Sequence, residues 1–398
     1  MGIKSYIRSA VNKAGWDVIR FNPKPANIPI VPQLSLSGDL TVDQLKEHVL
    51  HYTNSLRIMR DGELIGYRFS PSGSVPCLYS TIACVLLKNL LSEPLGEVKN
   101  ELDLIQNAQR DDGLFYDPEM ECPQAYSEDW WGYRHLSFHA VMALALYGRV
   151  ARYPTDLLGQ TADIERIPDF IETMDWGVRV AYTSNAIQNY VVLLQYARDF
   201  QDSVAAGDRS ELILQLIAAK VNQNTGLFGS WAPTEPRALS ENVQAAYHFW
   251  LLWFYEGRVP PHFDAAIPYV LQTQNPCGGF GLSWNSSCCE DIDSIDPLAR
   301  YLIGNQGSQL VTRGLERSLG SVMRSLNSDG GFVFRRGSAL SYGYTPAMRC
   351  LYDESCLFFT WFRMLSLAYA TEALGHGLVF GEAKPAWTWR RAPGLQFL

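Results

Sequence analysis

The sequence repeats one pattern several times, and this repeat constrains the fold more than any other feature. Each copy has an amphipathic helical stretch, then a Gly-aromatic turn, then a strongly apolar helical stretch. Gly226, Gly279 and Gly331 are separated by 53 and 52 residues, and Gly113 lies 113 residues before Gly226, which is about two units. Glycine permits the positive φ that ends a helix, and the aromatic residue packs the turn onto the core. The clear turns lie at 109–115, 224–229, 275–280 and 327–332, and degenerate copies at 60–62 and 175–177 complete six units.

The apolar helices after the turns are predicted to form an inner ring. Residues 138–146, for example, are apolar on nearly every face, which is typical of a helix buried on all sides. The amphipathic helices before the turns then form an outer ring, so six pairs predict an all-α fold, an (α/α)6 barrel of residues 41–376. Its inner helices are expected to begin near Val75, Ser127, Ser184, Ser240, Glu290 and Asp353. Residues 1–40 are expected to form an amphipathic helix and a Pro-rich linker, and residues 377–398 a C-terminal tail.

Composition restricts the class of partner. Hydrophobic residues make up 47% of the 398 residues and charged residues 19%, which is typical of a globular protein with a large core. A net charge of -8 without a long Lys/Arg run argues against nucleic acid, since phosphate contacts require clustered cations. The chain also contains 11 Trp, 20 Tyr and 18 Phe. A small hydrophobic ligand is therefore the expected partner.

The cysteines and the N-terminus bear on location. The eight cysteines form no CxxC motif and have no regular spacing, which favours reduced thiols in a cytoplasmic protein. No apolar run approaches the roughly 18 residues that a membrane-spanning helix needs. Residues 3–20 have a basic amphipathic pattern, which leaves two interpretations open. The helix either packs on the barrel or lies in a membrane interface, where it would give peripheral membrane contact.

Polar and acidic residues gather where the inner helices are predicted to begin. Inner helices of such a barrel run parallel, so their N-terminal turns meet at one mouth with their positive dipole ends. N-capping accounts for many of these residues, because Ser, Asp and Asn are favoured caps. It does not account for Asp291, Asp293 and Asp296 together, since three carboxylates around one turn repel unless one is protonated or a cation is bound. Functional residues are therefore expected at this mouth.

The Gly-aromatic turns and the apolar helix at 360–368 resemble the repeats and the last barrel helix of a known enzyme group. This group contains squalene-hopene cyclases, class II diterpene cyclases and protein prenyltransferase β subunits, and the resemblance covers about residues 41–376. With one helical domain where larger cyclases have two, the sequence is similar to single-domain class II meroterpenoid cyclases. The resemblance implies a terpene cyclase that protonates a linear prenyl chain, carried on an aromatic acid head group, and converts it into a polycyclic meroterpenoid. It implies no cofactor and no metal.

The resemblance leaves the position of the catalytic acid open. Class II cyclases use an aspartic acid as the proton donor, commonly in a DxDD-like motif. By its residue pattern, the DIDS stretch that contains Asp293 is similar to a DxDD motif in which Ser replaces the last Asp. By register, the family carries its acid four units before the last helix pair, which implies Asp129, the placement we favour at this point, and Asp353 is a third candidate. An alkene is so weak a base that the donor must be a protonated carboxylic acid, held in a low dielectric beside anions that raise its pKa.

The same chemistry suggests binding residues. Aromatic faces stabilise a migrating carbocation without acting as nucleophiles. The candidates are Trp130, Trp131, Tyr190, Tyr247, Trp250, Phe332, Phe358 and Phe359. A cluster of cations that could hold a diphosphate is absent from the sequence pattern. Arg335 and Arg336 follow the last Gly-aromatic turn, and Arg336 is the candidate for holding one carboxylate of a head group.

Three other functions fit parts of the sequence. A zinc-dependent protein prenyltransferase β subunit is suggested by Asp353 and Cys356, although their spacing is one residue longer than the family's pattern and its His is missing. His135 and His139 share a helical face, but no third ligand is evident. An (α/α)6 glycoside hydrolase or lyase would use paired carboxylates and Trp platforms for a sugar. A binding toroid without catalysis is the third alternative.

Overall fold

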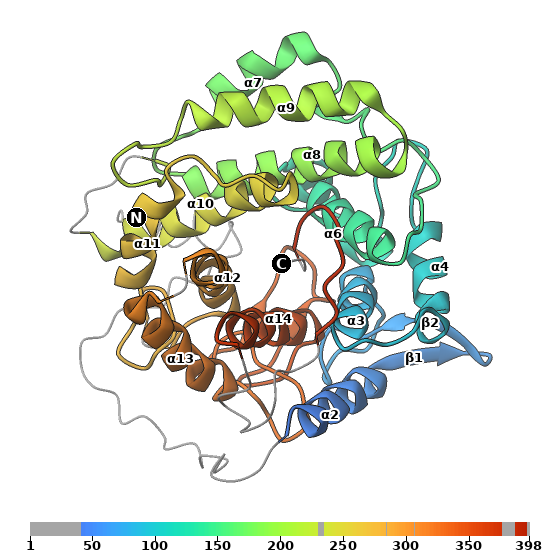
Figure 1. Cartoon of the computed structure of the whole chain (residues 1–398). Helices are drawn as coiled ribbons and strands as arrows, with labels where there is room; N and C mark the ends of the chain where they lie inside the picture. Colours follow the sequence, from blue (N-terminus) through green and yellow to red (C-terminus); the bar gives the residue numbers. More distant parts are fainter. Residues whose placement is uncertain (1–40, 230–234, 284, 306, 376–386, 396–398) are drawn as a thin grey trace, which may run out of the picture.

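The computed structural model describes residues 41–229, 235–283, 285–305, 307–375 and 387–395. The amphipathic helix and linker expected at residues 1–40 lie outside the described residues. Apart from the short helix α5 (Pro123–Ser127), the α-helices alternate along the described chain between an outer and an inner layer (Figure 1). The outer helices are α2 (Val42–Ser55), α4 (Lys99–Asn107), α7 (Ile167–Thr173), α9 (Val204–Ala218), α11 (Phe263–Gln272) and α13 (Gln309–Met323). The inner helices are α3 (Leu78–Leu90), α6 (Tyr133–Leu146), α8 (Val180–Phe200), α10 (Pro236–Tyr255), α12 (Cys288–Gly304) and α14 (Leu357–Ala373).

The inner helices form a closed ring (Figure 1). In this ring α3 packs on α6, α6 on α8, α8 on α10, α10 on α12 and α12 on α14, and α14 returns to α3. The outer helices lie against them, with α4 on α3 and α6, α9 on α8, and α13 on α12 and α14. This arrangement confirms the predicted all-α (α/α)6 barrel. The largest difference between a predicted and an observed inner-helix start, six residues, separates Ser127 from Tyr133.

Burial explains why the helices divide into two layers. Helix α14 is buried along nearly its whole length, from Leu357 to Thr371. Helix α13 instead buries one stripe that contains Val311, Leu315 and Val322, as an amphipathic outer helix should. Within the part of the chain that the structure describes, no helix combines the length and the hydropathy that crossing a bilayer requires.

The Gly-aromatic turns are tied to the inner helices by a shared hydrogen bond. In three of them the amide N–H of the Phe donates to a side chain on the following inner helix. The pairs are Phe115 to Ser137 Oγ (2.8 Å), Phe280 to Asp291 Oδ1 (2.8 Å) and Phe332 to Thr360 Oγ1 (2.9 Å). These bonds set a common register for the repeats. Two residues after each acceptor lie His139, Asp293 and Phe362. These three residues therefore occupy equivalent positions in their repeats.

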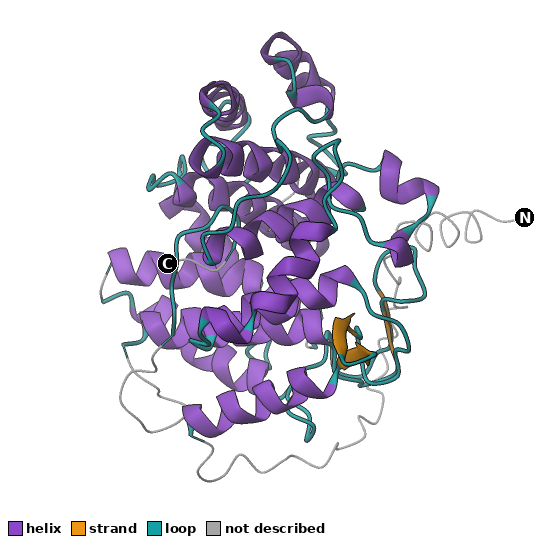
Figure 2. Ribbon diagram, turned by 90° about the vertical axis from the view of Figure 1, so that its right-hand side faces the viewer, coloured by secondary structure: helices purple, strands orange, loops and turns teal. Residues whose placement is uncertain are grey.

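Two short hairpins interrupt the helical pattern. Strands β1 (Arg57–Arg60) and β2 (Glu63–Tyr67) pair antiparallel, so the turn predicted at 60–62 joins two strands rather than two helices. Asp61 and Gly62 both have positive φ, which suits a two-residue hairpin turn. Strands β3 (Leu340–Ser341) and β4 (Arg349–Cys350) form the second hairpin. Figure 2 shows the strands at the edge of a helical body.

Residues 335–354, which we call the mouth segment, span the end of the barrel where the inner helices begin. Tyr344 OH donates to Glu128 at 3.1 Å, just before α6, and the carbonyl oxygen of Arg349 accepts from Ser70 Oγ at 2.8 Å, just before α3. The segment itself leads into α14. It therefore connects three repeats at one mouth, a feature that the repeat pattern did not predict.

Candidate active site

Helix α12 carries four acids in its first three turns, and two of them have local structural roles. Glu290 forms a capping box with Ser287, whose backbone N–H donates to Glu290 Oε2 at 2.9 Å. Asp291 accepts the Phe280 amide of the Gly-aromatic turn and forms an ion pair with Arg363 of α14. Burial raises the pKa of Asp291, and the Arg363 guanidinium opposes that shift.

Asp296 has partners deeper in the barrel. Its carboxylate lies 2.6 Å from Arg300 Nε and accepts from Tyr247 OH at 3.0 Å. Tyr369 of α14 hydrogen-bonds it as well. Because Tyr247 and Tyr369 belong to the helices on either side of α12, the Asp296 side chain points into the ring. Burial raises the pKa of Asp296, and Arg300 and the two tyrosines oppose that shift.

Asp293 stands apart from the other three acids. It lies three residues before Asp296 on the same helix face, and 4% of it is exposed. Among the described residues, none forms a hydrogen bond or an ion pair with its carboxyl group. Burial raises the pKa of Asp293 well above the ordinary 3.8, and nearby Cys289 and Glu290 raise that pKa further. Burial and these neighbouring groups therefore favour the protonated form of the Asp293 carboxyl group.

Aromatic rings line the interior of the barrel. The ring of Phe358 on α14 lies 5.4 Å from Tyr79 on α3, 5.3 Å from His139 on α6 and 5.6 Å from Tyr342 of the mouth segment, measured between centroids. Helices α6 and α14 are not neighbours in the ring, since α3 lies between them. The contact between His139 and Phe358 must therefore lie inside the barrel.

The interior histidines are neutral. Burial lowers the pKa of His135 well below its ordinary value, that of His139 to about 3 and that of His248 to about 4. His139 Nδ1 lies 2.9 Å from the carbonyl oxygen of His135. A carbonyl only accepts hydrogen bonds, so Nδ1 carries the proton and Nε2 presents a lone pair. His139 is thus a neutral base in an aromatic environment.

His139 and Asp293 lie on opposite sides of the barrel. The register of the Gly-aromatic turns makes them equivalent residues, on α6 and α12. Around the ring, α6 and α12 are three helices apart in either direction. A carboxyl group with a raised pKa and a neutral imidazole therefore stand at the same level on facing walls of the ring.

The mouth segment closes over this interior. The Tyr342 ring inserts among aromatic residues of the first and last repeats, 6.4 Å from Phe69, 5.8 Å from Tyr79 and 5.6 Å from Phe359. The next residue, Gly343, has a φ of +68° and lies so close to the Trp131 indole that a Cβ atom would overlap it. Only glycine allows this approach, and the mouth segment consequently packs tightly on the rim.

Asp129 lies at the predicted mouth but outside the interior. It precedes α6 rather than standing in its first turn, because Gly132 with a φ of 77° caps that helix. Asp129 Oδ1 lies 3.0 Å from Arg134 Nε and accepts from Tyr190 OH at 2.7 Å, and the side chain is 34% exposed. The Tyr190 ring packs on Phe170 of outer helix α7 at 5.6 Å. Asp129 is therefore an ion-paired group between the layers at the rim.

Asp353 also lies at this mouth, in the loop that precedes α14. It has a φ of 55°, and its Oδ1 accepts from the Gly337 amide at 2.5 Å and lies 3.8 Å from Arg336 Nη1. These bonds hold the mouth segment together. The carboxylate contacts none of the interior aromatic rings described above.

The aromatic candidates occupy several different environments. Tyr247 and Phe358 point into the interior, and Phe359 contacts Tyr342 beside it. Tyr190 and Trp250 face the outer layer, Trp250 through a contact of 5.2 Å with Phe263 of α11. Phe332 plugs its turn, while Trp130 and Trp131 lie at the rim. The interior residues that sequence reasoning missed are Tyr79, His139, Tyr342 and Tyr369, and the only signal for them was a His in an apolar run.

The two arginines after the last turn have different surroundings. Arg336 donates to Asn327 Oδ1 at 2.6 Å and to the carbonyl oxygens of Arg324 and Leu326, so all three of its nitrogens have protein partners. Arg335 donates from Nη2 to Glu290 at 2.9 Å. Its Nη1 has no partner among the described residues. Arg335 is thus the one of the two with a terminal guanidinium nitrogen that makes no hydrogen bond to the described residues.

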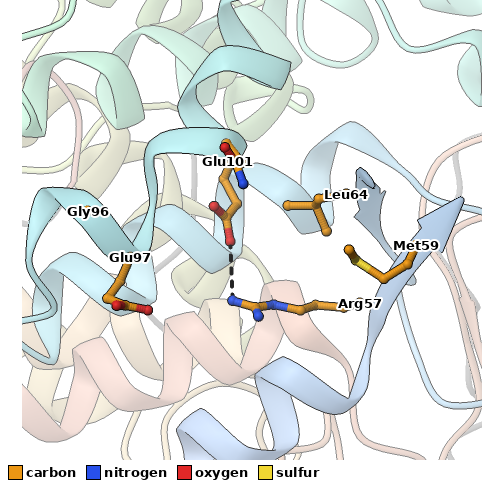
Figure 3. Close-up of a pocket in the computed structure, with 7 residues that line it drawn as sticks. Arg57, Met59, Leu64, Gly96, Glu97 and Glu101 are labelled. Atoms are coloured by element: carbon orange, nitrogen blue, oxygen red, sulfur yellow. Dashed lines mark ion pairs between the residues drawn. The ribbon is translucent and has the colours of Figure 1, made fainter. Parts of the chain in front are cut away.

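Two pockets at the outer helices lie away from this interior. The first, of about 190 Å³, is lined by Arg57, Met59, Leu64, Gly96, Glu97, Asn100 and Glu101, with an ion pair of 3.7 Å between Arg57 and Glu101 (Figure 3). The second, of about 600 Å³, lies along α2 and includes Lys46, His48, His51 and Asp329. In the described ranges, no three His, Cys, Asp or Glu side chains gather as a set of metal ligands.

Comparison with known proteins gives neighbours of similar architecture. No protein-family model and no curated protein matches the sequence. A variant of the type II terpene cyclase MstE from Scytonema, in complex with geranylgeranyl dihydroxybenzoate, is 13% identical, with 83% of this chain and 98% of that chain covered and a TM-score of 0.48. A glycosidase is 14% identical, with 83% and 97% covered and a TM-score of 0.47, and its variant in complex with glucose has the same values. Likeness at this level does not distinguish between the two reactions.

Proposed function

We propose that this protein is a class II terpene cyclase, which uses a protonated carboxylic acid to convert a linear prenyl chain on an aromatic acid head group into a polycyclic meroterpenoid. The observation that carries the proposal is Asp293, a buried carboxyl without hydrogen-bond or ion-pair partners among the described residues. Burial raises its pKa, and aromatic rings line the interior of the same barrel. The resemblance of the repeats to cyclase repeats supports the same reaction. The geometry therefore favours Asp293 over Asp129 as the proton donor.

The reaction begins at the Asp293 hydroxyl. The π electrons of the terminal double bond form a C–H bond with its proton, which leaves a tertiary carbocation on the substrate and a carboxylate on Asp293. Each internal double bond then attacks the cation before it and forms a C–C bond. The ring faces of Tyr79, Tyr342 and Phe358 stabilise the moving positive charge. The low pKa of His139 keeps a competing cation out of the interior.

The reaction ends when the last cation loses a proton. The electrons of a neighbouring C–H bond form the new double bond, and His139 Nε2 is positioned on the wall opposite Asp293 to accept the proton. Exchange with water at the mouth returns His139 to its neutral form and Asp293 to its acid form. The product is an isomer of the substrate, so no oxidant or reductant is consumed.

The head group is proposed to lie at the rim. A carboxylate there would accept from Arg335 Nη1, which has no partner among the described residues, and would lie near the start of α12. The sequence favoured Arg336 for this role. The hydrogen bonds of Arg336 to its own turn make Arg335 the better candidate.

Glycoside hydrolysis is less well supported by the same residues. It requires two carboxyl groups that divide the roles of acid and base or nucleophile. Asp291 and Asp296 are each engaged by an arginine, which leaves Asp293 without a second unpaired carboxyl on its helix. The zinc alternative rests on Asp353 and Cys356. Within the mouth segment, the Asp353 carboxylate already accepts a hydrogen bond from the Gly337 amide.

The test is product analysis in light and heavy water. The protein is incubated with hydroxybenzoates bearing geranyl, farnesyl and geranylgeranyl chains, and products are examined by mass spectrometry and NMR. We expect a product with the mass of the substrate and fewer double bonds in H₂O, and incorporation of a single deuterium in D₂O. Asp293→Asn should give neither. Release of reducing sugar from aryl glucosides, with every prenylated substrate recovered unchanged, would show a glycosidase instead.

A further inference from the structure

The C-terminal segment, residues 387–395, crosses the end of the barrel opposite the mouth. In Figure 1 it is the dark red trace beyond α14 that runs over the ring. Its donors bind backbone carbonyls or side chains at the C-terminal ends of four inner helices. The bonds are Thr388 N to Leu90 O (3.2 Å), Arg390 Nη1 to Leu146 O (2.8 Å), Arg391 Nη2 to Tyr255 O (2.9 Å) and Trp387 Nε1 to Thr371 Oγ1 (3.0 Å). Arginines suit this position, because helix C-terminal ends carry partial negative charge.

After crossing the opening, the segment turns into the barrel. Trp389 stacks on Tyr369 with centroids 5.1 Å apart, beside the Asp296 cluster. Residues 392–395 are buried. The Leu395 amide lies 3.1 Å from Met142 Sδ, and a Cβ atom on Gly394 would lie only 2.5 Å from the Phe138 ring. The tip of the segment thus packs against inner helix α6 from within the end of the ring.

The helix register gives the depth of this tip. Met142 is three residues beyond His139, which corresponds to about 4.5 Å along the helix axis. His139 is level with Asp293, so the tip lies roughly one helical turn below the acid and the base. On the other side, Tyr342 meets His135, one turn above His139, at a centroid distance of 6.5 Å. The interior between Tyr342 and the tip is therefore only about 10 Å high.

We propose that the C-terminal segment is the floor of the substrate cavity and sets the longest prenyl chain that the protein cyclises. This inference rests on the proposed cyclase function and adds a specificity determinant to it. The head group is held at the rim and the terminal double bond must reach Asp293. The additional length of a longer prenyl chain must therefore fold into the space between that acid and the floor. Leu395 and Gly394 occupy this space, whereas the inner helices alone would leave it open to the far end of the barrel.

The experiment compares chain-length profiles of the full-length protein and of matched variants. Leu395→Ala lowers the floor by removing side-chain volume, and a chain ending at residue 386 removes the floor altogether. Val311→Ala, a similar loss of packing on outer helix α13, is the control for general destabilisation. The substrates are hydroxybenzoates with geranyl, farnesyl, geranylgeranyl and geranylfarnesyl chains. Binding of hydroxybenzoates with saturated chains of matching length is measured by calorimetry in parallel, which needs no turnover.

We expect Leu395→Ala to raise the ratio of kcat/KM for the longer chain over the shorter by about tenfold, with a parallel shift in the binding optimum, while Val311→Ala matches the wild type. An unchanged profile in Leu395→Ala, with the wild type active, would overturn the floor but leave the cyclase function standing. If no prenylated substrate is cyclised by the wild type, the proposed function fails. Calorimetry then decides the role of the floor: the chain length that binds most tightly must still shift in Leu395→Ala, and an unchanged optimum would overturn the proposal. Should the shortened chain not fold, Leu395→Ala alone decides.

Discussion

Asp293 and His139 are equivalent residues of two repeats on facing walls of the ring, so the barrel interior separates a carboxyl group with a raised pKa from a neutral imidazole. The environment on each wall shifts the pKa of its group in the direction that favours the neutral form. Burial and neighbouring acidic groups raise the pKa of Asp293, while burial lowers the pKa of His139 to about 3. In the proposed reaction, Asp293 donates a proton at one wall and His139 accepts one at the other.

Asp293→Asn should abolish cyclisation. The amide keeps the size of the side chain but has no acidic proton, so turnover should fall at least about a thousandfold, with substrate binding nearly unchanged. Asp129→Asn and Asp353→Asn remove carboxylates that are bonded at the rim, and each should keep most of the activity. Steady-state kinetics and calorimetric binding check the set. Complete loss of turnover in Asp129→Asn, with near-normal turnover in Asp293→Asn, would instead identify Asp129 as the proton donor, as the register of the repeats implied.

The protonation of Asp293 should be visible in stability against pH. Its pKa is raised in the folded state, so unfolding releases a proton at pH values between the unfolded pKa of about 3.9 and the raised folded pKa. The free energy of unfolding of the wild type should then fall relative to that of Asp293→Asn as pH rises. The slope should reach about 1.4 kcal/mol per pH unit until the folded pKa is passed. Urea denaturation of both proteins from about pH 5 to about pH 8 measures it, and a constant difference would mean that Asp293 is ionised throughout.

His139→Phe should change the product and spare the first step. Without Nε2 opposite Asp293, the final cation should lose its proton elsewhere or capture water, which gives different double-bond isomers or alcohols. Deuterium incorporation from D₂O at the initiating carbon should persist, because Asp293 is intact. Product NMR distinguishes these results, and an unaltered product spectrum would remove His139 from the mechanism. Phe is a suitable replacement since it occupies the equivalent position in the last repeat, at Phe362.

Arg363→Met should destabilise the barrel by about 3–5 kcal/mol, because it leaves the buried Asp291 carboxylate without its cation. The double variant Arg363→Met with Asp291→Ser should recover most of this loss. A serine at position 291 can still accept the Phe280 amide, as Ser137 accepts the Phe115 amide in its own repeat. Urea denaturation provides the comparison. Equal stability of the single and double variants would show that the ion pair has little net effect.

Arg335→Ala and Arg336→Ala should have opposite signatures. Loss of Arg335 removes the donor proposed for the head-group carboxylate, so KM should rise far more than kcat falls. Loss of Arg336 breaks bonds to Asn327 and Leu326 in the last Gly-aromatic turn, so the melting temperature should fall with little change in KM. A rise in KM in Arg336→Ala alone would show that Arg336, the candidate from the sequence, binds the head-group carboxylate.

The fold could be predicted from the sequence, whereas the orientation of interior residues could not. Gly-aromatic turns near 52 residues apart fix the number of helix pairs, because each turn requires a glycine and each inner helix is apolar on every face. Because these inner helices are apolar on every face, the sequence does not indicate which face of each helix points into the barrel. Tyr190 and Trp250 therefore looked like interior residues but face the outer layer, while Tyr79 and His139 gave no comparable signal. The mouth segment escaped detection because residues 335–354 carry no periodic pattern, and its role depends on contacts with distant repeats.

The contact between α3 and α14 has a consequence for how this chain matures during synthesis. These helices belong to the first and last repeats, yet they are neighbours in the ring. Until α14 has left the ribosome, α3 lacks one of its two inner neighbours, and rings such as Tyr79 remain accessible to water. The nascent barrel is then an open arc with a long apolar seam, which is the kind of surface that chaperones recognise and that aggregation exploits. Final compaction is therefore expected to be late and cooperative, with the last repeat sealing the first.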